Sequence, residues 1–471
     1  MMSANDDKTI LGEADNLPTK NFVSLCSMKS KKKPIKPLKN ISAWVVSADM
    51  GYGHQRAVFP LKEIAEGELI TVGKNDGSTE KEKKSWKRLL EVYETFSRAR
   101  GVPLVGKPIF AMFDTMMHIP EFYPIRNLSR STYQVDLLEI NLKTGLCDGL
   151  MKKISTKPLP LITSYFAPAI AADIHGHEPI FCIICDADIN RVWVAKHPWE
   201  SRINYFAPCG KAAQRLKSYG VPEERIFLTG FPLPLDLLGK NLATIKSDVG
   251  QRLCILDPNN RFWTNRRRSV EQFLGKKNCI LSTKRPLTIT YSVGGAGAQK
   301  EIGGRIALSV KERIRAGTMR LNLVAGIRPE VISYFHDIKK DIGSDNIRVI
   351  SAETLHEYFR QFNMAMRETD ILWTKPSELS FYAGLGIPII MTPTIGSQER
   401  FNRQWLNEIH AGMEQKDPDY THQWLFESLH DGHIADMAWS GFLKARKLGT
   451  AKIMEVLETG KMTSSNSPLE R

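Results

Sequence analysis

The stretch ISAWVVSADMGYGHQRAVFPLKEIAEG, residues 41–67, decides the fold. It opens with a short apolar run rich in β-branched residues at 41–48, passes through a glycine-containing turn at 49–54, and continues as a helix-like segment at 56–67. A buried strand, a loop and a helix in this order begin a doubly wound α/β unit. We therefore expect a parallel sheet that is covered by helices.

The same alternation then recurs twice along the chain. In the first series we expect a helix at 211–219 and strands at 159–164, 179–185, 203–207 and 225–228. In the second series, which starts near residue 286, we expect strands at 287–293, 321–325, 347–350, 370–374 and 387–392, and helices at 301–316, 330–342, 354–367, 378–384 and 403–411. The sequence therefore predicts two α/β domains with a boundary near residue 240, followed by a long helix at 438–457.

Composition narrows the class of protein. The chain has 471 residues, of which 42% are hydrophobic and 25% charged, as in an ordinary globular protein. No uninterrupted apolar run is long enough to span a membrane, and the first 16 residues lack a secretory signal pattern. The expected location is cytoplasmic.

Positive charge is concentrated in an N-terminal arm. The net charge is +14, and residues 29–39 carry six lysines and two prolines. Such an arm suits an anionic membrane surface, at roughly 1 kcal/mol per lysine, but an ordinary solvated tail is equally compatible with it. No aromatic residues alternate with the lysines, so nucleic acid is not an expected partner.

The seven cysteines are odd in number and widely spread, which favours reduced thiols over disulfides. Cys182 and Cys185 form the one tight pair and follow His175 and His177. They lie in an expected strand, where residues three apart point to opposite faces, so we expect no metal site there.

Three expected loops carry polar or glycine-rich motifs. Gly294-Gly-Ala-Gly297 follows a strand and precedes a helix, which suits either a phosphate cradle or a simple tight turn. Lys375 and Glu378 follow another strand, although an acid there also suits a helix N-terminus. The residues of the next loop that suit sugar hydroxyls, or else helix capping, are Gln398, Glu399 and Asn402.

Five motifs in this order resemble those of the GT-B glycosyltransferases: Gly51-Tyr-Gly-His54, residues 220–232, Gly294-Gly-Ala-Gly297, Thr374-Lys-Pro376, and Gly396-Ser-Gln-Glu399 with Asn402. The resemblance covers roughly residues 41–430. Within these enzymes it is nearest to the monogalactosyldiacylglycerol synthase and processive diacylglycerol glucosyltransferase group, which is related to the lipid-linked N-acetylglucosaminyltransferase of peptidoglycan synthesis.

The resemblance implies two Rossmann-like doubly wound domains facing a cleft. Residues 1–40 are then a basic arm, 41–240 the acceptor domain, 241–435 the nucleotide-sugar domain, and 436–471 a helix packing back on the first domain, with a tail. It also implies inversion at the anomeric carbon, a UDP-linked donor, a lipid acceptor, and neither cofactor nor catalytic metal. Gly294, Gly295 and Gly297 would face the diphosphate, and Gln398, Glu399 and Asn402 the sugar.

Two positions depart from the family pattern. Met50 and Tyr52 interrupt the three consecutive glycines that usually precede the histidine of the first loop. The family's ribose-binding glutamate corresponds to Ala383, and Glu378 is the acid available to replace it.

The chemistry assigns roles to the remaining candidates. Inverting transfer needs a base for the acceptor hydroxyl, and His54, which matches the family's histidine, is suited to this because the ordinary pKa of a histidine, about 6.5, lies near working pH. Asp186, which matches the family's acidic residue, either orients this imidazole or is the base itself. Lys375 or Arg328 would neutralise the leaving diphosphate. The Met- and aromatic-rich residues 110–123 suit an acyl chain or core packing.

Two other functions stay open. A sugar-nucleotide epimerase of the same fold would place more acids and histidines around the donor sugar. A catalytically idle relative would bind a sugar nucleotide or a glycolipid without turnover.

Overall fold

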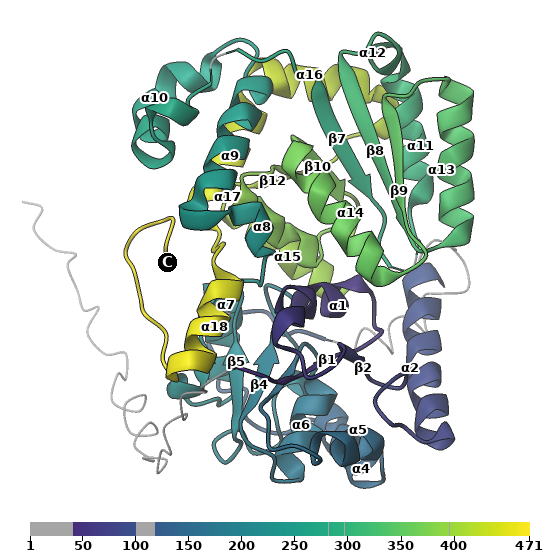
Figure 1. Cartoon of the computed structure of the whole chain (residues 1–471), viewed down its shortest axis with the longest axis vertical. Helices are drawn as coiled ribbons and strands as arrows, with labels where there is room; N and C mark the ends of the chain where they lie inside the picture. The colour runs from purple at the N-terminus through teal and green to yellow at the C-terminus, as the bar shows by residue number, and fades with distance from the viewer. Residues whose placement is uncertain (1–40, 100–117, 281, 296, 395) are drawn as a thin grey trace, which may run out of the picture. The chain divides into compact units, whose positions relative to one another are not determined.

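The computed structural model describes residues 41–99, 118–280, 282–295, 297–394 and 396–471 (Figure 1). The basic arm at 29–39 and most of the Met-rich segment lie outside these ranges. Within them, no helix is both long and apolar enough to cross a membrane.

The first domain is built on a sheet of six described strands, all paired in parallel. Across the sheet their order is β2 (Ile70–Thr71), β1 (Trp44–Ser47), β3 (Leu161–Thr163), β4 (Ile180–Ile183), β5 (Ile203–Phe206) and β6 (Ile226–Phe227). The central strands β1, β3, β4 and β5 are buried along their whole length, as expected where helices cover both faces.

The second domain repeats this plan with another six described parallel strands. Their order is β12 (Gly412–Glu414), β11 (Ile389–Met391), β10 (Ile371–Thr374), β7 (Leu287–Ser292), β8 (Met319–Gly326) and β9 (Ile347–Ser351). The prediction of two Rossmann-like doubly wound domains is confirmed.

Helices connect the strands. In the first domain they are α1 (Tyr52–Val58), α2 (Glu80–Ala99), α4 (Tyr133–Lys143), α5 (Asp148–Ile154), α6 (Phe166–Ile174) and α7 (Gly210–Ser218). The chain between the sheets forms α8 (Leu235–Leu238), α9 (Ala243–Leu256) and α10 (Arg261–Leu274). The chain after β7 adds α11 (Lys300–Ser309), α12 (Lys311–Arg315), α13 (Pro329–Ile342), α14 (Leu355–Glu368), α15 (Ser397–Glu408), α16 (Thr421–His430), α17 (His433–Lys444) and α18 (Gly449–Thr459). Figure 1 shows α11 and α13 side by side, and α17 against α9.

Several expected helices differ in detail from the observed ones. The segment 56–67 continues α1 as a 3₁₀ helix, η2 (Phe59–Ile64), with a proline in its first turn, and 378–384 is the 3₁₀ helix η7 (Glu378–Leu385). The single helix expected at 438–457 is wrong, because α17 ends at Lys444 and α18 begins at Gly449. Gly449 packs so closely on the Phe231 carbonyl that a Cβ there would lie 2.2 Å from its oxygen, and the Thr450 hydroxyl donates to the Leu233 carbonyl.

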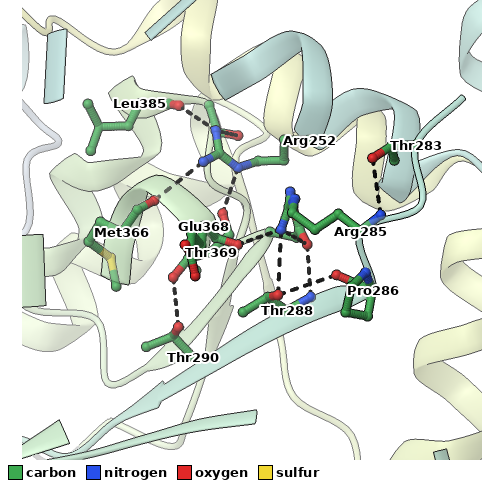
Figure 2. Close-up of polar contacts among 12 residues, drawn as sticks. Arg252, Thr283, Arg285, Pro286, Thr288, Thr290, Met366, Glu368, Thr369 and Leu385 are labelled. Carbon is green, nitrogen blue, oxygen red and sulfur yellow. Dashed lines mark hydrogen bonds and ion pairs between the residues drawn. The ribbon is translucent and has the colours of Figure 1, made fainter. Parts of the chain in front are cut away.

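A buried arginine fastens the second domain at the amino ends of β7 and β10, away from the carboxyl ends of its strands (Figure 2). The Arg252 guanidinium of α9 donates to the carbonyls of Thr369 at 2.8 Å and Leu385 at 2.9 Å, and reaches that of Met366 at 3.5 Å. Burial lowers the pKa of Arg252 to about 10, so it stays charged at neutral pH. One cation thus satisfies carbonyls at the ends of both α14 and η7.

Candidate functional site

A cavity of about 870 Å³ lies at the carboxyl ends of both sheets. The residues expected to carry chemistry or bind a ligand that line it are His54 and Asp186 from the first domain and Gly294, Gly295, Lys375, Glu378, Gln398 and Glu399 from the second. Of the expected site residues, Gly297, Arg328 and Asn402 do not line it.

The cavity coincides with the point in each sheet where the strand order reverses. His54 follows β1 and Ser164 follows the neighbouring β3, whereas Gly294 follows β7 and Lys375 follows the neighbouring β10. In open parallel sheets, ligands bind outside the carboxyl ends of the strands at such switch points. Here two switch points contribute to one cavity.

His54 is held in one tautomer. Its Nδ1 lies 2.7 Å from the Ser164 carbonyl oxygen, which only accepts hydrogen bonds, so Nδ1 carries the proton and Nε2 is the basic nitrogen. The Ser164 hydroxyl in turn donates to the His54 carbonyl at 2.7 Å. Burial lowers the pKa of His54, although the Ser164 carbonyl and the charge of Glu378 oppose that shift. The imidazole is therefore neutral at pH 7 and able to take a proton at Nε2.

Asp186 is joined to the second domain. It lies three residues beyond β4, and the Asn402 amide donates to its Oδ1 at 2.8 Å while Asn402 Oδ1 accepts from the Ala187 N–H at 2.7 Å. Burial raises the pKa of Asp186 to about 6, with the Asn402 hydrogen bond opposing and the charge of Glu378 adding to the shift. Asp186 therefore exchanges its proton near neutral pH, and the fully buried Asn402 connects two domains instead of facing the cavity.

The glycine loop is shaped by close approach. The Gly297 N–H donates to the Gly294 carbonyl at 2.8 Å, and Gly297 has a φ of 73°. A Cβ at Gly295 would lie 3.1 Å from the Tyr52 nitrogen, so the glycine loops of the two domains touch. Arg328 Nε donates to the Gly295 carbonyl at 2.8 Å, and this hydrogen bond stabilises the loop.

Lys375 supplies positive charge next to this loop. A Cβ at Gly294 would lie 2.6 Å from Lys375 Cε, so the lysine stem runs directly past the glycine. Its ammonium forms an ion pair with Glu399 at 2.7 Å, and both side chains are largely buried. The arrangement offers a cation and backbone N–H groups to a phosphate-bearing ligand.

Glu378 and Ala383 lie differently from what the sequence suggests. Glu378 lines the cavity but forms a buried ion pair with Arg56 Nε at 3.2 Å, so one of its carboxylate oxygens is already engaged. Ala383 is fully buried and packs against Gly441, where a Cβ would lie 2.7 Å from the Ala383 carbonyl oxygen. The missing family glutamate therefore leaves no gap in the cavity wall.

Sequence reasoning missed an aromatic wall and Arg56. Trp86, Tyr165, Phe166 and Trp193 line the first-domain side of the cavity, and Tyr165 and Trp193 pack around the His54 ring at 5.0 and 6.0 Å between ring centroids. They come from three separate elements, α2, the start of α6 and the 3₁₀ helix at Arg191–Trp193, so no local pattern groups them. The one signal for Arg56 is a cation followed by the apolar residues 57–59.

Across the described ranges, no group of three or more His, Cys, Asp or Glu side chains is placed to hold a metal ion. Cys182 and Cys185 are both buried, and burial raises the pKa of each thiol well above its ordinary value.

Comparisons with known proteins give remote similarities. Residues 328–451 match a family model described as a domain of unknown function, DUF6938, and no curated protein matches the chain. The S. aureus MnaA–UDP co-structure is similar over 90% of this chain and 99% of its own, with 11% identity and a TM-score of 0.45. UDP-GlcNAc 2-epimerase from Neisseria meningitidis bound to UDP-GlcNAc (14% identity, TM-score 0.43) and MurG from Acinetobacter baumannii (12%, 0.43) each match over 88% of this chain and 99% of their own. At these values the similarities assign no activity to the chain.

Proposed function

We propose that this protein is an inverting glycosyltransferase that moves a sugar from a UDP-linked donor to a lipid or other hydrophobic acceptor. The observation that carries the proposal is that one cavity holds His54 with a basic Nε2 on one side and the glycine loop with Lys375 on the other. A base and a diphosphate cradle at one cavity are the two elements that inverting transfer needs.

The proposed chemistry divides between the two domains. His54 Nε2 takes the proton of the acceptor hydroxyl, and the oxygen attacks the anomeric carbon opposite the diphosphate. The bond to the diphosphate breaks as the new bond forms, which inverts the anomeric configuration. Backbone N–H groups of the glycine loop and the Lys375 ammonium stabilise the departing charge, while Asp186 is the alternative base. No metal or cofactor enters these steps.

The acceptor class follows from the wall of the cavity. Trp86, Tyr165, Phe166 and Trp193 present aromatic surface there, and Leu137 and Leu138 of α4 add aliphatic surface. This lining supports a hydrophobic acceptor. In this proposal residues 41–240 bind the acceptor and 241–435 the donor, and the basic arm attaches the protein to an anionic inner membrane face.

A sugar-nucleotide epimerase is the second candidate, because three carboxylates, Asp186, Glu378 and Glu399, line the cavity together with His54. Two of them are neutralised, Glu378 by Arg56 and Glu399 by Lys375. Asp186 is therefore the only one of the three without an ion pair to another described residue. This favours transfer, which needs one base, over epimerisation, for which we expect more unpaired acids around the donor sugar.

The first test is binding. The melting temperature of the full chain is measured with a panel of nucleoside-diphosphate sugars, and a rise with one of them identifies the donor. That donor is then incubated with and without a hydrophobic acceptor in detergent, and products are read by NMR. Transfer with inverted configuration supports the proposal. A sugar epimer formed without acceptor supports the epimerase, and binding without turnover supports the idle relative.

A further inference from the structure

Helix α1 has two faces that contact different domains. Tyr52, Arg56 and Phe59 are spaced by four and three residues, so they lie on one side of the helix and its η2 extension. Tyr52 packs on Tyr358 at 5.1 Å between ring centroids, and Phe59 on Phe359 at 5.2 Å, both in α14 of the second domain. His54, in contrast, contacts Ser164 of the first domain.

The Arg56 side chain is surrounded by residues of the second domain. Its guanidinium carbon lies 4.3 Å from the ring centroid of Phe362, 4.8 Å from Phe359 and 5.6 Å from Tyr358, and Nη2 donates to the Tyr358 hydroxyl at 3.1 Å. Nε forms the ion pair with Glu378, and the Arg56 side chain is only 4% exposed. A planar guanidinium can stack on aromatic rings and bond a carboxylate at the same time, so its orientation is fixed. A lysine ammonium has no plane to stack and would not be held in one orientation.

The Arg56–Glu378 contact also affects the position of His54. Arg56 and His54 are two residues apart in α1, so a shift of the Arg56 backbone carries His54 with it. Glu378, which Arg56 holds, lines the same cavity as His54. The distance between the base and the donor side of the cavity therefore depends on this pair.

We propose that Arg56 is a positioning residue that ties the helix bearing His54 to the second domain through Glu378, and thereby sets the place of the base relative to the donor. Its catalytic consequence rests on the proposed glycosyltransferase activity. Its structural consequence, the environment of the His54 imidazole, does not.

The structural arm of the test uses NMR titration of His54 in the full chain, with its signal identified by its loss in His54→Gln. In Arg56→Met the helix loses its anchor and the pKa of His54 rises towards its ordinary value. The Arg56→Met, Glu378→Gln double variant removes the unpaired carboxylate as well. A pKa that stays raised in the double variant supports a displaced helix. The proposal is overturned if the pKa of His54 in Arg56→Met equals that of the wild type. It is also overturned if the pKa in the double variant returns fully to the wild-type value.

The kinetic arm separates positioning from stability. Arg56→Met lowers kcat by ~10²-fold, the loss typical of a misplaced catalytic group, with donor KM changed by less than about 3-fold. Arg56→Lys keeps the charge and recovers only part of that loss. The matched control is Lys62→Ala, which removes an exposed contact of the same segment to His356 at 3.4 Å and leaves kcat unchanged. A folded Arg56→Met protein with normal kcat overturns the positioning role. If the wild type has no turnover, the proposed function fails and the titration still decides the inference.

Discussion

The Asn402 amide of α15 donates to Asp186 Oδ1 at 2.8 Å, across 216 positions of the sequence. This bond favours the charged carboxylate, whereas burial, the larger effect, favours the protonated form and raises the pKa of Asp186 to about 6. Asp186 is therefore a cavity-lining acid with a raised pKa, and a residue of the opposite domain stabilises its charged form.

Replacing Asp186 by Asn is expected to stabilise the protein at neutral pH. The folded chain binds the Asp186 proton more tightly than the unfolded chain does, so the free energy of unfolding falls as pH rises from 3.8 to about 6. Asp186→Asn removes this loss and gains about 3 kcal/mol at pH 7.5 but nothing at pH 4. Urea unfolding at the two pH values measures the difference.

The matched control is Asp436→Asn, which removes an exposed ion pair to Arg266. Its effect should stay under about 1 kcal/mol and be destabilising. An Asp186→Asn protein that is less stable than the wild type at pH 7.5 would show that the carboxylate is not under strain.

Removing the His54 imidazole should affect turnover and spare donor binding. His54→Ala is expected to lower kcat by ~10²- to 10⁴-fold because the hydroxyl proton loses its acceptor, while donor affinity, measured by calorimetry, stays within about 3-fold. In the wild type, kcat/KM should rise with pH through a pKa below 6.5 and then level off, since burial lowers the pKa of His54.

His175→Ala is the control for losing a histidine. The His175 Nδ1 also contacts a backbone carbonyl, that of Ala171 at 2.9 Å, but the residue does not line the cavity. Normal turnover in His54→Ala would move the role of base to Asp186, and lost donor affinity would mean that the imidazole contacts the diphosphate.

Local sequence patterns predicted which loops meet at the site. His54, Gly294 and Lys375 each follow an apolar strand, and parallel strands bring the residues after them to one edge of the sheet. The edge strands β2 (Ile70–Thr71) and β12 (Gly412–Glu414) were missed because neither lies in an apolar run long enough to stand out from its polar and glycine-containing surroundings. Arg56 with Glu378 and Asp186 with Asn402 depend on how two separately patterned domains pack, which no local window contains.

Arg252 is expected to matter for stability and not for binding. Arg252→Met leaves the buried carbonyls of Thr369 and Leu385 without their donor, so the free energy of unfolding should fall by about 2 to 4 kcal/mol. Nucleotide-sugar affinity should not change, because the residue lies away from the cavity. Arg367→Met, which removes an exposed pair to Asp248, should cost under about 1 kcal/mol. Equal losses in the two variants would contradict the special role of Arg252.

The basic arm is expected to bind anionic vesicles. The six lysines at 29–39 should hold the full chain on vesicles that contain anionic lipid, and neutral vesicles should not bind it. Binding should weaken as salt rises, since the screening length is about 8 Å at physiological ionic strength, and should fall on deletion of residues 1–40. Cosedimentation measures both effects. If vesicle binding does not change with salt or on deletion of residues 1–40, the arm is an ordinary solvated tail.

Substitutions in the glycine loop should distinguish its two contacts. Gly294→Ala places a methyl group against the Lys375 stem, which is flexible, so the ammonium is displaced and donor affinity should fall by about 10-fold with little loss of stability. Gly295→Val meets the backbone at Gly51 and Tyr52, which cannot yield in the same way. It should therefore weaken donor affinity further and also lower the melting temperature, because the two loops are pushed apart.

Gly210→Ala, where a Cβ meets no atom within 4 Å, is the control that changes neither quantity. Calorimetry with the donor and thermal unfolding provide the two readings, and unchanged affinity in folded Gly294→Ala and Gly295→Val proteins would remove the loop from the donor site.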